Sequence, residues 1–166
     1  MDELTEPTLL LRRRASQTPS ARLHRQLRDD AVSLGIGVEM TVTVGRHGLL
    51  RTLAATDGIA EAATQHQYDL AAGPILETLR SGRERMAVRL DAIGCGSPAL
   101  AQIAGLGYHA LATLTLPVAP PAQGVLTVYL ARARPPLAQV LPRLRVRRAA
   151  YGGLVTRELL AFGLTD

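Results

Sequence analysis

The sequence contains no lysine, no asparagine and no tryptophan, and all 19 of its basic side chains other than histidine are arginine. A Walker-type phosphate-binding loop and a Schiff-base nucleophile both need a lysine, so these two chemistries are excluded. The sequence also lacks the His-Glu-x-x-His pattern of zinc peptidases, the Gly-x-Ser-x-Gly turn of serine hydrolases and the acidic spacing of a calcium loop. These absences argue against several common classes of enzyme.

Cysteine occurs once, at Cys95. One cysteine cannot form an intramolecular disulfide or supply a thiolate cluster for zinc. A redox-sensitive thiol is one interpretation of this residue, and an unreactive small apolar side chain is the favoured one. His47, His66 and His109 are isolated and lack the paired spacing of metal ligands, so we expect no metal site.

Long apolar runs are also absent, so we expect no membrane-spanning segment. The first six residues are acidic, whereas a secretory signal begins with basic residues. We therefore expect a cytoplasmic protein. A chain of 166 residues with 47% apolar content is long enough for one good hydrophobic core, which predicts a single domain.

The positive charge is concentrated near the end of the chain. The net charge is +5, and residues 132–166 alone carry seven arginines against two acids. Arg143, Arg145, Arg147 and Arg148 make up most of this excess. Because no aromatic residues are interleaved with them, we favour a solvated helix face over a nucleic-acid surface and expect no nucleic-acid partner.

Alternation of apolar residues predicts five strands, whereas three- and four-residue spacing predicts helices. The first strand places Val38, Met40 and Val42 on one side and polar residues on the other, as in a half-buried strand. The strands are expected at 37–44, 49–56, 86–90, 108–118 and 124–131. The helices are expected at 18–35, 57–68, 74–81, 97–106 and 137–162, the last with disturbances at Pro142 and Gly152-Gly153.

This order of elements indicates an α+β protein with a central, mostly antiparallel sheet and helices on both faces. The most informative segment is 65–82. There, Gly73-Pro74 forms a turn that opens directly into a short amphipathic helix, and Gly82 ends that helix. Tyr68 precedes the turn and has an apolar ring with a polar tip.

The chain resembles a GAF domain, most closely the GAF portion of bacterial GAF-ANTAR regulators, over residues 20–160. The residues that carry the resemblance are Gln67-Tyr68, Gly73-Pro74, Arg89-Leu90-Asp91, Gly107-Tyr108, Pro117 and Tyr129. It implies a profilin-like sheet with helices on both faces. Residues 1–15 would form a flexible or partner-dependent lead, and residues 16–166 one GAF-like domain with N- and C-terminal helices.

Three features depart from the GAF-ANTAR pattern. Ile75 stands where the branch often has cysteine, and residues 94–98 replace its usual Arg-Trp-Pro element. The RNA-binding ANTAR helices do not follow the domain in this sequence, so we do not expect antitermination by this chain alone.

The resemblance implies a non-enzymatic regulatory domain that senses a small molecule and forms a homodimer, with a role in transcriptional or signalling control. We expect the ligand pocket to be lined by Tyr68, Ile75, Leu79, Met86, Ile103 and Tyr108. For Tyr68, filling a gap between helix and sheet is the favoured alternative to ligand contact. The apolar stripe of the terminal helices predicts dimer contacts through Leu23, Leu27, Leu144, Tyr151, Val155 and Leu159.

Two alternatives remain from the residues themselves. In the first, the domain is a ligand-free scaffold that binds a protein or nucleic acid through its arginine-rich helix. In the second, it is an enzyme like the GAF-related reductases of free methionine sulfoxide, which we disfavour because that chemistry needs a second cysteine. The sequence names no cofactor, ligand or regulatory protein partner.

Overall fold

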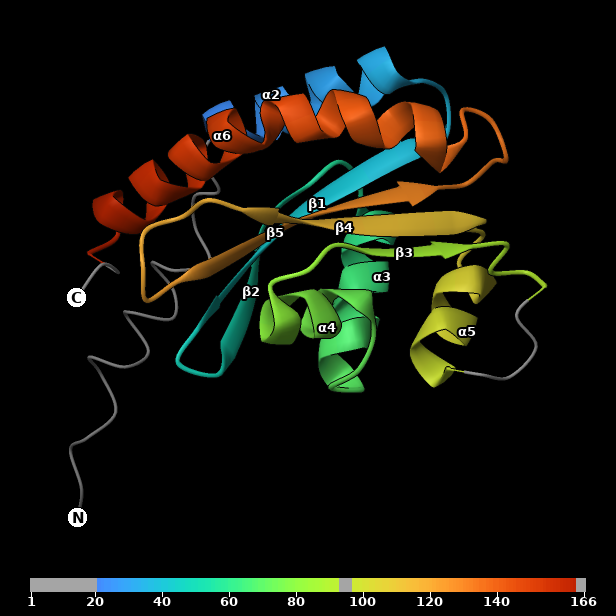
Figure 1. Cartoon of the computed structure of the whole chain (residues 1–166), viewed down its shortest axis with the longest axis horizontal. Coiled ribbons are helices and arrows are strands. Elements are labelled where there is room, and N and C mark those ends of the chain that lie inside the picture. Colours follow the sequence, from blue (N-terminus) through green and yellow to red (C-terminus); the bar gives the residue numbers. More distant parts are fainter. Residues whose placement is uncertain (1–20, 93–96, 164–166) are drawn as a thin grey trace.

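A five-stranded antiparallel sheet lies at the centre of the computed structural model, which describes residues 21–92 and 97–163 (Figure 1). In chain order the elements are α2 (Ala21–Leu34), β1 (Val38–Arg46), β2 (Leu49–Ala55), α3 (Gly58–Asp69), α4 (Pro74–Ser81), β3 (Arg85–Val88), α5 (Pro98–Gly105), β4 (Ala110–Leu116), β5 (Gln123–Leu130) and α6 (Leu137–Ala161). The predicted α+β class and order of elements are confirmed. The expected lead at 1–15 and Cys95 lie outside the described residues.

The strand order in the sheet is β2-β1-β5-β4-β3, and each neighbouring pair is antiparallel. The hairpins β1-β2 and β4-β5 therefore meet through β1 and β5, where Val42 lies opposite Leu126. A bulge between Val42 and Thr43 shifts the register of β1 against β2. Within the described residues, the sheet is open and does not close on itself, so β2 and β3 are its edge strands.

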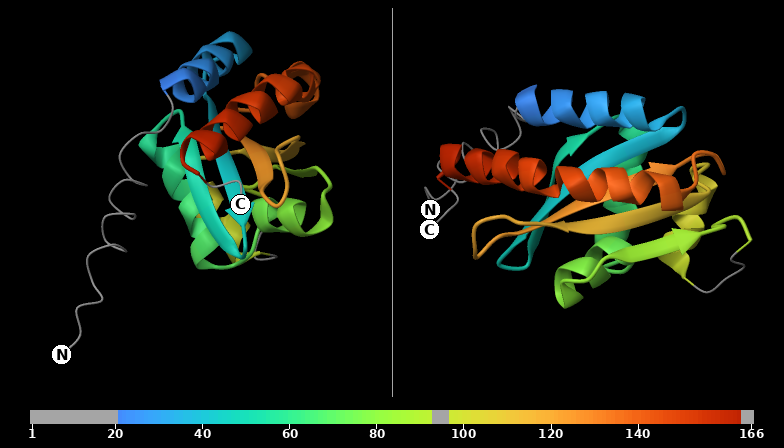
Figure 2. Two further views of the ribbon diagram at one scale, coloured as in Figure 1. Left: turned by 90° about the vertical axis from the view of Figure 1, so that its left-hand side faces the viewer. Right: turned by 45° about the horizontal axis from the view of Figure 1, so that its top comes forward.

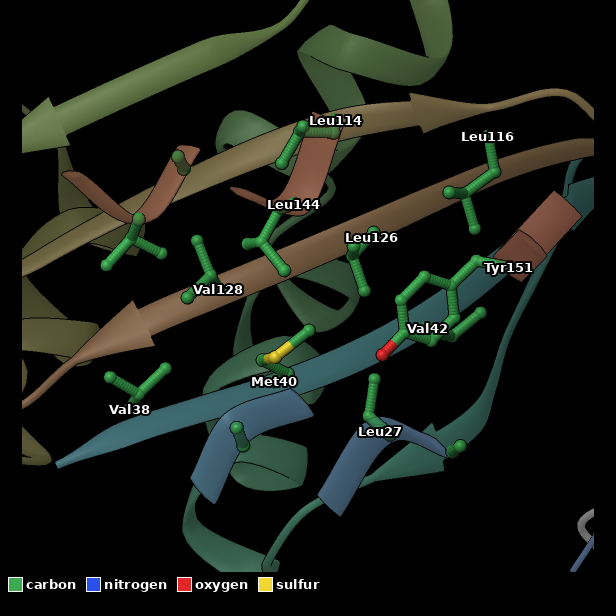
Figure 3. Packing of buried hydrophobic residues seen from close by; sticks show 14 of the residues in the cluster. Leu27, Val38, Met40, Val42, Leu114, Leu116, Leu126, Val128, Leu144 and Tyr151 are labelled. Carbon is green, nitrogen blue, oxygen red and sulfur yellow. The ribbon is translucent and has the colours of Figure 1, made fainter. Parts of the chain in front are cut away.

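Helices α2 and α6 lie side by side on one face of the sheet, and α3, α4 and α5 lie on the other (Figures 1 and 2). The larger hydrophobic core lies under α2 and α6. Figure 3 shows its side chains, including Leu27, Met40, Leu126, Leu144 and Tyr151, pointing into the space between the helices and the sheet. Each fully buried leucine of this core contributes roughly 1.5–3 kcal/mol.

The predicted helix ends are confirmed by their capping bonds. Asp57 caps α3 by accepting a hydrogen bond from the Ala60 N–H at 2.7 Å. Ser97 caps α5 in the same way through Leu100. Gly82, with φ of 66°, ends α4 in the left-handed region.

Helix α6 is continuous through Pro142, so the predicted disturbance does not divide it. The two adjacent glycines of α6 face different surroundings. Gly152 faces the end of β4, where a Cβ atom would lie 2.3 Å from the carbonyl oxygen of Pro117. Gly153 faces open space.

A partly buried carboxylate ties α2 to α6. Asp30 accepts hydrogen bonds from the Tyr151 hydroxyl at 2.7 Å, from Arg147 Nε at 3.2 Å and from Gln26 Nε2 at 3.0 Å. Charge-assisted bonds of this kind are stronger than neutral ones. They fix the relative position of the two terminal helices. Within residues 21–92 and 97–163, no helix is long and apolar enough to cross a membrane.

Candidate functional site

Hydroxyl groups line the face of the sheet that α3, α4 and α5 cover. Thr41, Thr127 and Thr113 lie side by side on β1, β5 and β4, and all three are fully buried. The sequence pattern placed such threonines on the polar side of a half-buried strand. Because helices cover both faces of the sheet, these hydroxyls lie in the interior and need hydrogen-bond partners there.

Hydrogen bonds connect the outer two threonines of this row to the covering helices. Thr41 Oγ1 lies 2.9 Å from Thr64 Oγ1 of α3, and Thr113 Oγ1 lies 2.5 Å from Thr78 Oγ1 of α4. Thr64 also bonds to the Tyr129 hydroxyl at 2.8 Å. The polar face of the sheet thus holds α3 and α4 in place.

Gln67 links α3 to the first turn of α4. Its Nε2 donates to the Tyr129 hydroxyl at 3.0 Å, and its Oε1 accepts the N–H of Ile75 at 2.9 Å. This N–H is one of the unpaired donors at a helix start, and Gly73 provides no side chain that could cap it. A buried amide side chain therefore performs the capping role.

The Tyr68 hydroxyl lies between two strands. It is 2.6 Å from Thr43 Oγ1 of β1 and 3.1 Å from Thr52 Oγ1 of β2. Burial raises the pKa of Tyr68 above 10.0, and the two hydrogen bonds oppose this effect only in part. Its hydroxyl stays neutral and ties the helix to the sheet, which agrees with the packing interpretation of this residue.

Two buried hydroxyls at this site have no hydrogen-bond partner among the described residues: Thr127 Oγ1 and the Tyr108 OH. Tyr108 is only 4% exposed, and its ring lies against Tyr129 with 4.9 Å between centroids. Burial, followed by the nearby charges of Asp57 and Glu39, raises the pKa of Tyr108 far above its ordinary value. Its hydroxyl is therefore a neutral donor that lacks an acceptor.

A hollow of about 250 Å³ opens at the C-terminal end of α4. Thr78, Leu79 and Thr115 line it, together with Val118 from the β4-β5 connection and Gly124 of β5. Because Thr78 bonds to Thr113, the hollow reaches the edge of the hydroxyl-lined face.

Solved structures with this arrangement of sheet and helices include GAF domains. The GAF domain of a two-component sensor histidine kinase from Bacillus halodurans is 11% identical with a TM-score of 0.58, and the match covers 87% of this chain and 99% of that one. A phycoerythrobilin-bound GAF domain from a cyanobacterial phytochrome is 11% identical with a TM-score of 0.59, covering 93% and 96%. The fold is that of a GAF domain.

The chain is also similar to Escherichia coli SdiA in complex with octanoyl-rac-glycerol. That match has 19% identity and a TM-score of 0.59, and covers 92% of this chain but 64% of SdiA, so the chain spans about two thirds of SdiA. No protein-family model and no curated protein matches the sequence. Similarity at these identities shows the GAF fold alone, and the closer resemblance to GAF-ANTAR regulators stays a prediction.

Five of the six predicted ligand residues lie on the α3-α4-α5 side of the GAF fold. Ile103 and Tyr108 belong to one buried cluster with Leu111 and Tyr129. Ile75 and Tyr68 lie on the neighbouring helices and join the network through Gln67 and Thr43. Leu79 lies at the end of α4, where it lines the hollow.

The placement of Met86 differs from the prediction. Met86 is 59% exposed and pairs with Ala112, which belongs to the core under α2 and α6. It therefore faces the opposite side of the sheet from the predicted pocket, at an edge that α6 does not cover. The apolar alternation identified the strand correctly, but Ala87 is the residue that packs against the ligand-side cluster.

All six residues predicted to contact a second copy lie in the core of the single chain. They are Leu23, Leu27, Leu144, Tyr151, Val155 and Leu159, and none is more than 3% exposed. The apolar stripe was expected to extend beyond the cover of the sheet, but the sheet is long enough to bury it. The surface of α6 that a second copy could reach is formed by other residues.

The arginine cluster of α6 bonds within the chain. Arg143 donates to the Ser33 carbonyl, Arg145 pairs with Glu84 at 2.9 Å, Arg147 pairs with Asp30, and Arg148 donates to the Thr115 carbonyl at 2.8 Å. These bonds fasten α6 to α2 and to the β3-β4 side of the sheet.

The sequence interpretation missed the threonine row, the effect of the Glu39 and Asp57 charges on Tyr108, and the role of Gln67. One signal was available, since the strands at 37–44 and 108–118 alternate threonine with apolar residues. A strand predicted to have helices on both faces must bury such threonines. The hydrogen bond that the Ile75 N–H donates to Gln67 Oε1 could not be predicted from the sequence, because it depends on how the chain turns at Gly73.

Proposed function

We propose that this chain is a non-enzymatic signal-sensing domain that binds a small molecule between the sheet and α3, α4 and α5. The support is the GAF fold together with a buried, hydroxyl-lined face at the place where the resemblance predicted a pocket. The site offers hydroxyl and amide groups, and the raised tyrosine pKa values keep its phenols neutral. Such groups recognise a ligand better than they catalyse a reaction.

The unpaired hydroxyls of Tyr108 and Thr127 carry this proposal. An unpaired buried hydroxyl costs about 1–3 kcal/mol. A ligand that accepts a bond from Tyr108 would remove this cost, and the resulting free energy would favour the bound state. Native structures keep few such groups, and each calls for an explanation.

The charges near Tyr108 restrict the chemistry of the ligand. The carboxylates of Asp57 and Glu39 are close enough to raise the pKa of Tyr108, so they create a negative potential at its hydroxyl. An anionic ligand would be repelled there, whereas an uncharged or cationic one would not. The SdiA complex holds octanoyl-rac-glycerol, a molecule with hydroxyl and ester groups, in a protein of the same fold.

Replacing Tyr108 by phenylalanine is the direct test. We expect Tyr108→Phe to raise the free energy of unfolding of the unliganded protein by about 1 kcal/mol, because it removes an unpaired hydroxyl. The thermal shift caused by ligands should fall. The measurement is a thermal-shift screen of wild type and variant against neutral, cationic and anionic metabolites, with hits expected in the first two classes.

Tyr129→Phe is the matched control, because the Tyr129 hydroxyl bonds to Thr64 and Gln67. This variant should lose about 1–2 kcal/mol of stability. The ligand proposal fails if no class of metabolite shifts the unfolding temperature, or if Tyr108→Phe destabilises the unliganded protein as Tyr129→Phe does.

We further propose that the domain forms a homodimer through the outward face of α6. Val146, Ala150, Gly153 and Leu160 recur on this face at steps of three, four and seven residues, and Val146 is 83% exposed. This spacing is that of helices that pack side by side. A ligand that favours one arrangement of α2 and α6 would then shift the dimer between two states.

The substitution Ala150→Glu should convert a dimer into a monomer, because it places a carboxylate in the centre of this face. The matched control is Ala101→Glu, at an exposed position of α5 on the other side of the sheet. Sedimentation velocity distinguishes the two species. A monomeric wild type, or a dimer that survives Ala150→Glu, would refute the dimer proposal and leave the ligand proposal standing.

A further inference from the structure

Strand β3 is an edge strand with one open side. It pairs with β4, and no other strand among the described residues pairs with it. In Figures 1 and 2 it runs along the rim of the sheet, with α4 and α5 beneath it rather than beside it. An edge strand presents a row of backbone N–H and C=O groups that can pair with another extended chain.

The side chains of this edge are suited to such pairing. Met86 and Val88 are 59% and 51% exposed, and their cross-strand neighbours Ala112 and Ala110 are small. Two apolar side chains are therefore exposed at the rim, on the α2-α6 face of the sheet but beyond the part that α6 covers. An added strand would place every second side chain beside them, where cross-strand pairs contribute to stability.

The charges at the two ends of β3 are positive. Arg83 and Arg89 are exposed, and no described residue forms an ion pair or hydrogen bond with either guanidinium. The neighbouring charged groups Glu84, Arg85 and Asp91 have partners within the chain, and the partner of Asp91 is His109 Nδ1 at 3.4 Å. Glu84 pairs with arginines of α6, and Arg85 pairs with Glu77.

We propose that the β3 edge binds an extended peptide whose apolar residues alternate with polar ones and whose ends are acidic. The peptide adds a strand beside Arg85–Val88, pairs its apolar side chains with Met86 and Val88, and places its acids near Arg83 and Arg89. The interaction is separate from the ligand site, because it uses the rim and the opposite face of the sheet.

A second copy of the chain is a poorer occupant of this edge. Two β3 strands related by a twofold axis would run antiparallel, with the Arg83 end of each against the Arg89 end of the other. Like charges in such positions disfavour the complex. An acidic peptide meets a complementary charge at each end.

The test uses a fluorescent peptide of alternating valine and threonine with aspartates at both ends. Fluorescence anisotropy with the full chain should show saturable binding, and amide hydrogen exchange should slow at 85–88. The double variant Arg83→Glu with Arg89→Glu should bind about tenfold more weakly, and it should prefer the same peptide with lysine ends. Val88→Lys should also weaken binding, because it removes an apolar contact.

The double variant Arg22→Glu with Arg25→Glu, at exposed positions of α2, is the matched control and should bind like wild type. Circular dichroism confirms that all variants are folded. Three results would overturn the proposal: no binding by wild type, equal binding of a peptide with its aspartates in the centre, or a change of oligomeric state in Val88→Lys. The last would assign the edge to a second copy.

Discussion

Gly152→Ala is expected to lower the free energy of unfolding by about 3 kcal/mol, a large effect for a single added methyl group. The new Cβ atom would lie 2.3 Å from the carbonyl oxygen of Pro117 and 2.8 Å from Cγ of the same residue. A backbone oxygen at the end of a central strand cannot move without displacing the strand, so α6 itself must shift. Urea unfolding followed by circular dichroism measures the change.

Gly153→Ala is the matched control, since it changes the next residue of the same helix by the same group. Its Cβ would meet nothing within 4 Å. Alanine favours a helix over glycine by about 1 kcal/mol, so this variant should be as stable as wild type or more so. Equal destabilisation by both substitutions would show that α6 needs the two glycines for its flexibility, and not for its close approach to Pro117.

Gly73→Ala is the second substitution with a large expected effect, about 3 kcal/mol of lost stability. Gly73 has a φ of 115°, a backbone conformation that residues with a side chain rarely adopt. An added Cβ would lie 2.8 Å from Gln67 Oε1. Gln67 would have to leave Ile75 and Tyr129, so two buried polar groups would lose their partner. We also expect the variant to lose any response to ligand, because α4 and the hydroxyl network shift together.

The control for this substitution is Gly82→Ala, at the other end of α4. Gly82 also has a positive φ, 66°, but a Cβ there would meet nothing within 4 Å. Its loss should therefore be limited to the backbone cost, about 1 kcal/mol. Comparable losses for the two variants in thermal or urea unfolding would mean that the Gln67 contact adds nothing to the backbone conformation.

These glycines show how the two faces of the domain are fixed. Gly152 lets α6 approach the strands, and Asp30 then ties α6 to α2. Gly73 lets the chain turn so that Gln67 can hold α4 against the sheet. The proposed ligand would contact elements that are bonded to β1 and β5, and α2 and α6 pack on the other face of the sheet.

Local patterns in the sequence were sufficient for the elements, and they placed the strand ends within two residues of those in the structure. The alternation at Val38, Met40 and Val42 predicted β1, and the capping residues Asp57 and Ser97 predicted the starts of α3 and α5. Both signals act within a few residues, through the side-chain period of the backbone and through bonds to the first helical turn. They are therefore present in the sequence whatever the rest of the chain does.

The errors arose where the outcome depended on which surface covers which residue. Met86 follows the same alternation as Val42, but it lies on an edge strand that α6 does not reach. Tyr151 and Leu27 fit a dimer stripe equally well, but they are buried by the sheet. Periodic apolar residues show that one face of a helix or strand is buried. They do not show whether the same chain or a second one buries it.

The sequence by itself determined an α+β chain with one antiparallel sheet, the positions of its strands and helices, and the turn at Gly73-Pro74. The tertiary structure alone decided that the threonines become an interior hydroxyl network, that Gln67 caps α4, and that Tyr108 keeps an unpaired hydroxyl. The reason is the range of the interactions. Periodicity and capping act between neighbours in sequence, whereas burial and hydrogen-bond pairing bring together residues such as Thr64 and Tyr129 that lie far apart along the chain.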